Sequence, residues 1–330
     1  MWRHRSPPTP AKQRGVALIT AVLIVAMASI AAMAMTHTLQ LSIRRTGNIL
    51  AMDQFYHYTL GSEAWARGLL IRDLQDNNQK GYDGLDEDWA DKLGPMPVEG
   101  GTVVASTQDL QARFNLNNLY LANESSEQEK QRVARELAIF QRLLALLEIE
   151  ESIAQATADW LDQDINPQFP NGAEDNTYLS NEQPYRTGNG LMGSVTELRL
   201  IQGMTPEDYE KLSPYLTVLP ESTPINVNTA DPLLLRAVIN DLDEGAAEQL
   251  TSDREENPFK DKATFMEKLK GLLDQNKVKS EEIDPVISVS SRFYQLETQV
   301  QMEDVSQSLL SLLYKSDKGV VVVSRLFGSF

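Results

Sequence analysis

The sequence predicts an α+β fold, in which a long N-terminal helix accompanies an antiparallel sheet and a large all-helical insertion interrupts the sheet. Three observations predict it. An uncharged apolar run lies near the N-terminus, two groups of alternating segments lie at 101–119 and 286–328, and the residues between them carry helix periodicity and capping signals.

The apolar run covers residues 16–35 and contains no charged side chain. About 20 such residues in a helix span the hydrocarbon core of a membrane. The short segment before it holds Arg3, Arg5, Lys12 and Arg14 without an acid. Positive charge on the short side predicts a cytoplasmic N-terminus, with the rest of the chain exported across the membrane.

A cleavable secretory signal is the rival interpretation, since Ala26-Met27-Ala28 and Ala32-Met33-Ala34 could be cleavage sites. However, the uncharged run is longer than a usual signal core. Residues 44–75 also continue a helical spacing through Ile49, Met52, Tyr56 and Leu60. We therefore expect an anchored stalk helix.

The elements after the stalk follow from local signals. Residues 77–100 are rich in Gly, Asp and Pro and predict a surface loop, and residues 101–119 predict two strands with a turn near 107–109. Ser126 and Glu129 form a capping-box pair, and a second helix should end near Asp162. Further helices are expected from Ser194, Thr205 and Asp231 and over 259–273, before strands at 286–328 with a turn at 316–319.

The net charge and the residue types exclude several classes of function. A formal charge of −17 repels phosphate backbones, so no nucleic-acid partner is expected. The chain has no cysteine and thus no disulfide to hold a loop. Its histidines, His4, His37 and His57, lie in the leader or the stalk. No Ser-His-Asp grouping can form beyond them, and we expect no catalytic residues.

The junction Arg14-Gly15 followed by Val16-Ala17-Leu18-Ile19 resembles the processing site of type IV prepilins and pseudopilins. The resemblance implies that a prepilin peptidase cuts after Gly15 and methylates Val16, while the apolar helix stays. Most pilins have Glu at the fifth mature position, which pairs with a neighbouring subunit's amine. Here that position is Thr20, which suits a subunit with nothing ahead of it.

Three further stretches resemble the type II secretion protein K family, the largest minor pseudopilins, in the right order along nearly the whole chain. They are FNLNNL (114–119), WLDQD to PYRTGN (160–189) and INVNTA (225–230). The family implies a pilin-like fold divided as follows: leader 1–15, transmembrane half-helix 16–44, stalk and first strands 45–124, helical insertion 125–284, and C-terminal strands 285–330.

The resemblance also implies a function. Such a chain would lie at the tip of the secretion pseudopilus, nucleate or cap the fibre, and support export of folded proteins from the periplasm across the outer membrane. Its partners would be two smaller minor pseudopilins of the I and J types, the prepilin peptidase and the inner membrane, with secreted exoproteins as further candidates.

An acidic loop without regular structure is the main candidate site. Asp162, Asp164, Glu174 and Asp175 lie among Asn, Gly and Pro, where water must screen the carboxylates or a cation must neutralise them. Ca²⁺ takes six to eight oxygens of this kind, and the lack of Cys and His argues against zinc. The spacing is not that of an EF-hand. A merely solvated acidic loop remains the alternative.

The family resemblance favours the metal, because members of the family carry two adjacent calcium ions in this insertion. Thr187 and Asn189, in PYRTGN, are expected to close the site from the far end of the loop. A different class of function also fits a calcium loop on an anchor, namely a membrane-anchored periplasmic domain that binds or hydrolyses carbohydrate.

INVNTA also resembles the opening of helix-hairpin-helix modules that bind DNA backbone. Such modules present backbone amides and basic side chains to phosphate. Here the following turn, at 240–244, carries Asp241, Asp243 and Glu244, which would repel a phosphate. We therefore interpret the motif as a helix cap within a small helical subdomain.

Overall fold

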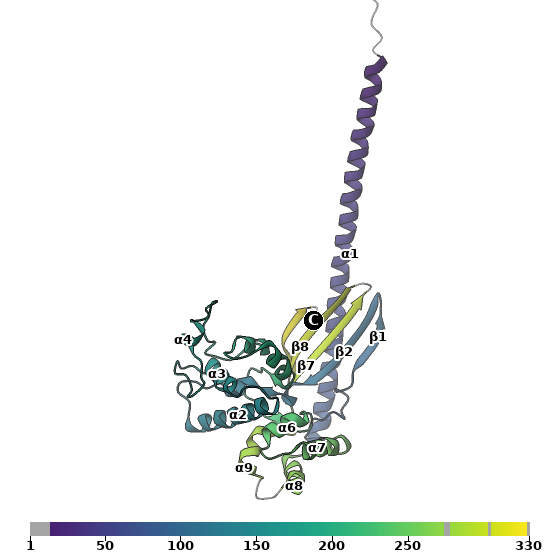
Figure 1. Cartoon of the computed structure of the whole chain (residues 1–330). Helices are drawn as coiled ribbons and strands as arrows, with labels where there is room; N and C mark the ends of the chain where they lie inside the picture. Colours follow the sequence, from purple (N-terminus) through teal and green to yellow (C-terminus); the bar gives the residue numbers. More distant parts are fainter. Residues whose placement is uncertain (1–13, 274–277, 303–304, 329–330) are drawn as a thin grey trace, which may run out of the picture. The chain divides into compact units, whose positions relative to one another are not determined.

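The computed structural model describes residues 14–273, 278–302 and 305–328. Its contacts divide the chain into two units, Met1–Tyr58 and Thr59–Phe330. Helix α1 (Arg14–Lys80) contributes to both units (Figure 1). The predicted continuation of the helix over 44–75 is thereby confirmed.

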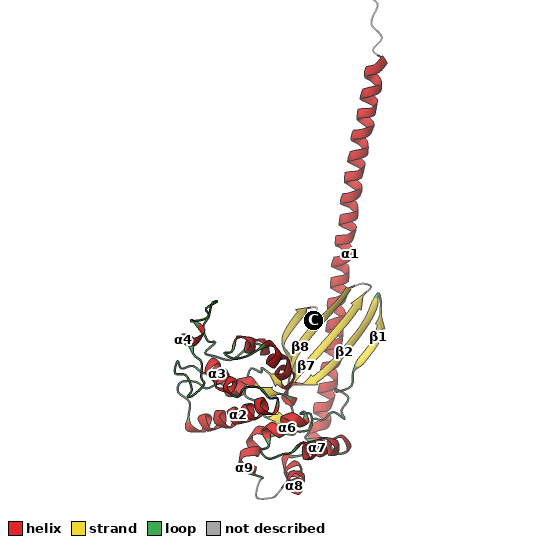
Figure 2. Ribbon diagram, in the orientation of Figure 1, coloured by secondary structure: helices red, strands yellow, loops and turns green. Residues whose placement is uncertain are grey.

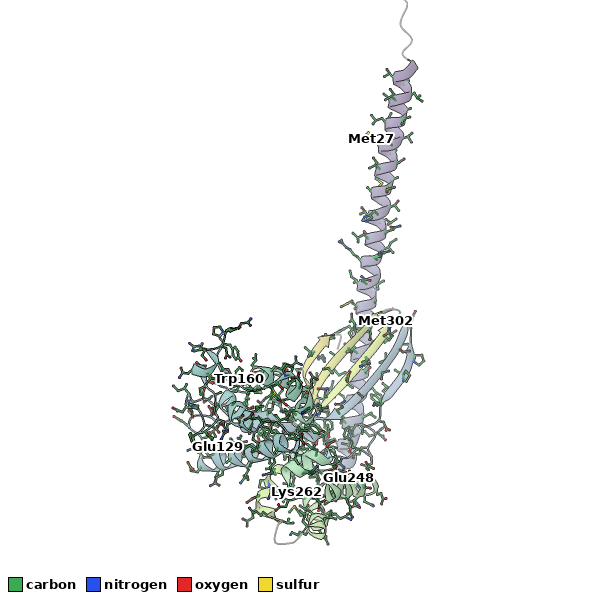
Figure 3. The ribbon with its side chains drawn as sticks, in the orientation of Figure 1. Met27, Glu129, Trp160, Glu248, Lys262 and Met302 are labelled. Atoms are coloured by element: carbon green, nitrogen blue, oxygen red, sulfur yellow. The ribbon has the colours of Figure 1, made fainter. Side chains whose placement is uncertain are left out.

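In the first unit, residues 16–50 of α1 are exposed on every face of the helix, including Met27 (Figure 3), whereas Phe55 is buried. By length and composition this helix could cross a membrane. Its hydroxyls bond to backbone carbonyls one turn earlier: Thr20 Oγ1 to Val16 O at 3.1 Å, and Ser29 Oγ to Val25 O at 2.9 Å. Hydroxyls satisfied within the helix cost less to place in lipid.

The second unit contains a five-stranded antiparallel sheet in the order β1-β2-β7-β8-β9 (Figure 1). The strands are β1 (Leu93–Val98), β2 (Gly101–Asp109), β7 (Phe293–Met302), β8 (Val305–Ser316) and β9 (Gly319–Gly328). Because β2 pairs directly with β7, residues 110–292 form an excursion between two neighbouring strands. The predicted α+β class, with its antiparallel sheet and helical insertion, is confirmed.

The part of α1 after Thr59 packs on this sheet. Ala66 and Leu70, one helical turn apart, are buried against Trp89, Tyr294 and Leu313. The spacing of four places both side chains on one face of the helix. Trp89 and Tyr294 meet edge to face with ring centroids 5.0 Å apart, so the helix and the sheet share an apolar core.

The predicted turn at 107–109 is wrong, and so is the prediction that 77–100 is all loop. Strand β2 runs straight to Asp109 and pairs with β1, which lies inside that loop segment, and with β7. The stretch after Asp109 forms a 3₁₀ turn, η1 (Leu110–Ala112), the short β3 (Phe114–Asn115) and another turn, η2 (Leu116–Leu119). Two prolines in β1 hid its strand character.

The excursion is mainly helical (Figure 2). Its helices are α2 (Glu127–Leu146), α3 (Ser152–Leu161), α4 (Asp175–Tyr178), α5 (Pro206–Leu212), α6 (Pro232–Val238), α7 (Glu244–Glu256), α8 (Lys262–Leu272) and α9 (Ser280–Ile283), with 3₁₀ turns η3 (Val195–Leu200), η4 (Ser213–Tyr215) and η5 (Asp284–Val286). Two short parallel pairs join β3 to β4 (Leu216–Thr217) and β5 (Ile225–Asn226) to β6 (Ile287–Ser288).

The predicted helix starts are confirmed where a cap marks them. Ser126 and Glu129 form the capping box of α2, Thr205 caps α5 ahead of Pro206, and Asp231 caps α6. Helix α8 begins later than predicted, because Asp261 Oδ1 accepts from Thr264 N at 2.7 Å and fixes the first turn there.

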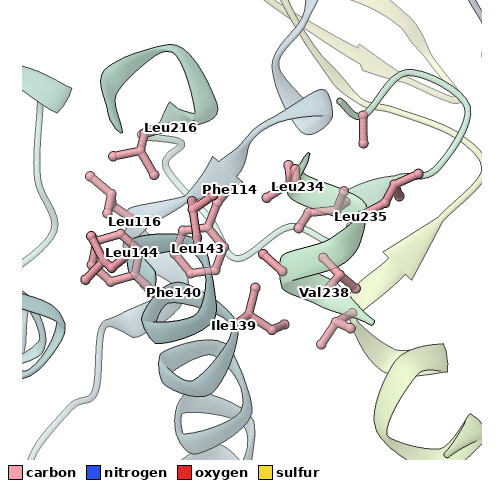
Figure 4. Packing of buried hydrophobic residues seen from close by; sticks show 14 of the residues in the cluster. Phe114, Leu116, Ile139, Phe140, Leu143, Leu144, Leu216, Leu234, Leu235 and Val238 are labelled. Carbon is pink, nitrogen blue, oxygen red and sulfur yellow. The ribbon is translucent and has the colours of Figure 1, made fainter. Parts of the chain in front are cut away.

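The helices enclose an apolar core of their own (Figure 4). Phe114 stacks on Phe140 of α2 with centroids 5.4 Å apart. Leu234 and Leu235 of α6 are also buried in this cluster. Since all of its buried residues except Tyr82 belong to the excursion, the helical part forms a structural module around its own apolar core.

Candidate metal centre

The acidic loop begins where α3 ends. Asp162 is the C-terminal residue of that helix turn, and its Oδ1 accepts from Asp164 N at 3.3 Å. Asp164 Oδ1 in turn accepts from Asn166 N at 2.7 Å. These two turns, each closed by an Asp side chain, direct the chain away from the helix and hold both carboxylates near its end.

Glu174 returns to the same place from the other end of the loop. One carboxylate oxygen from each of Asp162, Asp164 and Glu174 lies within 4.8 Å of the others. Asp162 and Glu174 are buried, with exposed fractions of 6% and 3%, and Asp164 is exposed. The structure therefore brings together three of the six predicted ligands, two of them buried and one exposed.

Burial and the closeness of the carboxylates make the ionised forms of Asp162 and Glu174 less favourable, which raises their pKa values. Burial, followed by repulsion from Asp159, Asp162 and Asp164, raises the pKa of Glu174 to about 7. Burial and the neighbouring Asp164 raise the pKa of Asp162 to about 6. In the described part of the chain, no Lys or Arg forms an ion pair with any of the three carboxylates that meet here. Their negative charge lacks a counter-ion from the protein itself.

Several oxygens around the loop also lack hydrogen-bond donors. Both carboxylate oxygens of Glu174 and Oδ1 of Asn189 are buried without a partner among the described residues. Asn189 has a φ of 42°, in the left-handed region that Asn tolerates better than most residues. Buried acceptors without donors are costly, and a cation would satisfy them.

Asp175 and Thr187, the remaining predicted ligands, bond to each other. Asp175 Oδ1 accepts from Thr187 N at 3.1 Å and from Thr187 Oγ1 at 3.0 Å, and its Oδ2 lies 3.6 Å from Arg186 Nη1. This pair ties the start of α4 to the PYRTGN segment. Whether either residue binds a metal stays a prediction.

Asp159 belongs to the same neighbourhood, although it is not among the six predicted ligands. It lies one helical turn before Asp162, and its carboxylate accepts from Gln168 N at 3.1 Å. Burial raises its pKa to about 7. A side chain on Gly172 would collide with this carboxylate, so Gly172 allows the loop to close over Asp159.

Three aromatic side chains from the two ends of the acidic loop pack against one another. Trp160 of α3 (Figure 3) meets Tyr178 edge to face at 5.4 Å, and Tyr178 lies 5.3 Å from Tyr185. A Cβ on Gly188 would come within 2.9 Å of Trp160 Nε1, so that glycine lets the backbone lie against the indole. Trp160 is therefore a packing residue at the end of α3.

A second cluster of carboxylates in the chain differs from the loop cluster in having a lysine as its counter-ion. Asp73, Asp83 and Glu87 also bring their carboxylate oxygens within 4.8 Å of one another. There the chain supplies its own cation: Lys315 Nζ lies 3.0 Å from Asp73 Oδ2 and contacts Asp83 Oδ1. Lys315 is buried with the carboxylates. The loop cluster has the same crowding without such a lysine.

The donor set fits a hard cation. Asp162, Asp164 and Glu174 offer carboxylate oxygens, and Ca²⁺ prefers such ligands. Whether the buried amide oxygen of Asn189 joins them stays a prediction. The observation that carries this fit is the buried, partnerless carboxylate of Glu174. Calcium would neutralise the cluster and hold the two ends of the loop together.

The motifs FNLNNL and INVNTA prove to be structural. Asn117 Nδ2 donates to Leu219 O at 2.9 Å and Asn118 Nδ2 to Thr223 O at 2.9 Å. Asn226 Nδ2 donates to Asp109 Oδ2 at 3.1 Å and Ser291 Oγ at 3.0 Å. INVNTA is therefore not the predicted helix cap, because Asp231 caps α6 and Asn226 joins the helical module to the sheet.

The predicted processing site, Gly15 and Val16, lies in the first turn of α1. Thr20 follows one turn later, with its hydroxyl 3.0 Å from Ala17 O and 3.1 Å from Val16 O. Among the described residues, His37 and His57 are both on α1 before Thr59, and His4 lies outside the described residues.

Comparison with known proteins identifies the family. The model of type II secretion system protein K matches in two parts, residues 112–221 and 225–285. Type II secretion system protein K of Pseudomonas aeruginosa is 36% identical over 325 residues, 96% of this chain and 93% of the relative. That of Klebsiella pneumoniae is 32% identical over 328 residues, 97% and 98% of the two chains.

The fold has a solved counterpart. One chain of the crystal structure of the GspK-GspI-GspJ complex from the enterotoxigenic Escherichia coli type 2 secretion system matches with a TM-score of 0.72 at 23% identity, over 87% of this chain and all of that chain. Together with the family model and the relatives, this fold shows that the chain belongs to the type II secretion system protein K family.

Proposed function

We propose that this chain is the minor pseudopilin at the tip of a type II secretion pseudopilus, where it nucleates or caps the fibre and supports export of folded proteins across the outer membrane. The observation that carries the proposal is the helical excursion, residues 110–292, inserted between β2 and β7. A module of that size beside the sheet leaves little room for a further subunit stacked above it.

The N-terminal helix supports the same position. At the fifth position after Gly15, Thr20 satisfies its hydroxyl within its own helix. Family members in the shaft would use a Glu there to pair with the amine of the subunit ahead, and a tip subunit has no such neighbour. The leader would be removed by the prepilin peptidase, and the mature chain would start in the inner membrane with most of its residues in the periplasm.

The partners of this chain would be two smaller minor pseudopilins of the I and J types. Support comes from the structural neighbour, which was solved as a complex of GspK with GspI and GspJ. The apolar residues of α1 that the spacing singled out, Ile49 and Met52, are exposed in this chain and would be covered by the partner helices. In this proposal the chain is a structural subunit and not an enzyme.

We propose further that the acidic loop binds calcium. Asp162, Asp164 and Glu174 would hold the ion, with Asn189 completing the set and with Asp175 and Thr187 as candidates for the second of the two ions that the family resemblance implies. When bound, the metal would replace the protons that the raised pKa values of Asp162 and Glu174 favour. It would thus stabilise the loop that leads from α3 to α4.

Reconstitution tests the tip position. The chain, produced with its cognate I-type and J-type pseudopilins, should elute as one complex with one copy of each subunit by light scattering. Produced alone it should stay monomeric, because a cap is needed once per fibre. Polymers of the chain alone, or labelled copies repeated along isolated pseudopili, would contradict the proposal. Electron microscopy of gold-labelled fibres distinguishes one terminal label from many.

A further inference from the structure

The loop that leaves the metal centre exposes two large apolar side chains. Phe169 is 93% and Ile165 is 71% exposed, the two highest values for large apolar side chains among the described residues from Thr59 onward. A single exposed apolar side chain needs no explanation, but two such highly exposed apolar side chains four residues apart on one loop point to a contact site. We call residues 165–170 the apolar finger.

The backbone of the apolar finger is held from both sides. Gln168 N donates to the buried carboxylate of Asp159 at 3.1 Å, and Gly172 N donates to Gln168 O at 2.7 Å. Gln155 of α3 donates to Phe169 O at 3.3 Å. Pro167 and Pro170 restrict the backbone further. Phe169 is therefore presented by an ordered loop, so little conformational entropy is lost when it binds.

The charge around the finger limits the kind of partner. Residues 143–185 contain nine acidic residues and no Lys or Arg. Lipid surfaces in bacteria carry negative headgroups, and a loop that inserts into them needs basic residues at its base. Here the base is acidic. A protein surface with an apolar socket and a rim of Lys or Arg complements both features.

We propose that the apolar finger is a docking element that places Phe169 and Ile165 into an apolar, basic-rimmed socket on a folded partner protein. The inference rests on the proposed tip position, since only a terminal subunit keeps this loop free of following subunits. Exposed aromatic anchors of this kind supply a large share of binding energy when a pocket encloses them.

Substitution of the two anchors tests the inference. In the full chain, Ile165→Ser combined with Phe169→Ser should lower the amount of secreted protein in the medium at least about tenfold. The melting temperature and the yield of the complex with the I-type and J-type pseudopilins should match wild type. Leu200→Ser, which removes another exposed apolar side chain of the helical module, should secrete normally.

Cross-linking identifies the socket. The photoreactive p-benzoylphenylalanine at position 169 of the full chain, irradiated in cells, should form an adduct whose mapped peptide combines apolar residues with Lys or Arg. Adducts only with phospholipid, or only with a second copy of this chain, would overturn the inference, as would normal secretion by the double variant. Those results would not contradict the tip position, which is tested separately by complex formation. Only failure of the wild-type chain to form the complex with the I-type and J-type pseudopilins would contradict it.

Discussion

Glu136 and Glu174 are both buried glutamates of the helical module, with exposed fractions of 5% and 3%. Neither forms an ion pair within the part of the chain that the structure describes. Burial raises the pKa of each to about 7. The difference lies in their neighbours: Glu136 has Arg132 and Arg135 nearby, whereas Glu174 faces three other carboxylates. Glu136 therefore has positive charge nearby to offset its ionised form, whereas Glu174 would need a proton or the proposed cation to offset the crowding of negative charge.

Replacing Glu174 tests the metal centre. In detergent, about millimolar calcium should raise the melting temperature of the wild-type chain, since a ligand at 100 times its dissociation constant adds about 2.7 kcal/mol. Glu174→Gln should lose most of that gain because a buried charged ligand is gone. Scanning calorimetry with calcium and with chelator measures both.

The control for that experiment is Glu182→Gln, which removes an exposed carboxylate from the same loop and should respond to calcium as wild type does. In chelator, Glu174→Gln should be at least as stable as wild type, since one repelling charge is removed. If the melting temperature of the wild-type chain is the same with calcium and with chelator, the acidic loop is only solvated and binds no calcium.

Glu136 gives a pH dependence with a defined sign. Its pKa is about 7 when folded and about 4.5 when unfolded, so the folded chain binds more protons between these values. Stability is therefore complete below about pH 4.5 and falls as the pH rises towards 7. Glu136→Gln removes this loss.

The stability gain of Glu136→Gln over wild type should accordingly be small at pH 5 and grow to at most about 3 kcal/mol at pH 8. Urea unfolding at the two pH values measures the gain. The exposed Glu150→Gln serves as control and should give no such difference. A gain equal at both pH values would show that packing, and not ionisation, decides the effect.

At the scale of elements, the sequence predicted helices better than strands. The starts of α2, α5 and α6 could be located because a cap involves residues only two or three positions apart. Strand β2 pairs with its neighbour β1 and with β7, which follows the whole helical excursion, and no local pattern reports that distant second partner. The predicted turn at 107–109 failed for that reason, since the strand continues wherever its partners do.

In the candidate site, too, the sequence predicted what depends on neighbouring residues and missed what depends on contacts between distant ones. Asp162 and Asp164 lie together because they are neighbours in sequence, and the pattern found them. That Glu174 returns to them depends on the loop closing over Asp159 through Gln168 and Gly172. That Asp175 turns towards Thr187 depends on one hydrogen-bond pair. Neither follows from composition, so the sequence could supply the ligand types and not their grouping.

The junction between the helical module and the sheet supplies a third prediction. Asn226 Nδ2 donates to Asp109, Asp83 O and Ser291, and all four residues are buried. Asn226→Ala would leave buried acceptors without a donor, so we expect a loss of about 2–4 kcal/mol of unfolding free energy. Chemical denaturation measures it, with the exposed Asn240→Ala as control.

An unchanged denaturation midpoint for Asn226→Ala would mean that water replaces the amide, and that the module is attached to the sheet mainly by its apolar contacts.

At the scale of the whole molecule, the proposed leader and α1 would decide whether the chain reaches a fibre. The bond proposed for cleavage, after Gly15, lies in the first turn of a helix whose apolar run would stay in the chain after processing. Gly15→Ala should block the peptidase and leave an unassembled precursor in the inner membrane. Mass spectrometry of the purified chain would find Met1 or Trp2 at its start, where the wild type begins with methylated Val16.

The control Gln13→Ala changes the leader without touching the cleaved bond and should be processed normally. Normal removal of the leader from Gly15→Ala would contradict the assignment of the processing site, and a wild-type N-terminus near Ala34 would indicate an ordinary secretory signal instead.

The adjacency of β2 and β7 has a consequence for folding. The two strands align residue for residue from Gly101 with Met302 to Asp109 with Tyr294, and every residue of the helical module must be gathered between them before they can pair. Closing a longer loop costs more entropy, and non-local pairing slows folding. If the helical module has already folded, it holds Asp109 and Phe293 close together, and only a short loop then has to close before β2 and β7 pair. We therefore expect the module to form first and the sheet last, so that a newly exported chain keeps the apolar face of α1 around Leu70 uncovered until its final three strands arrive.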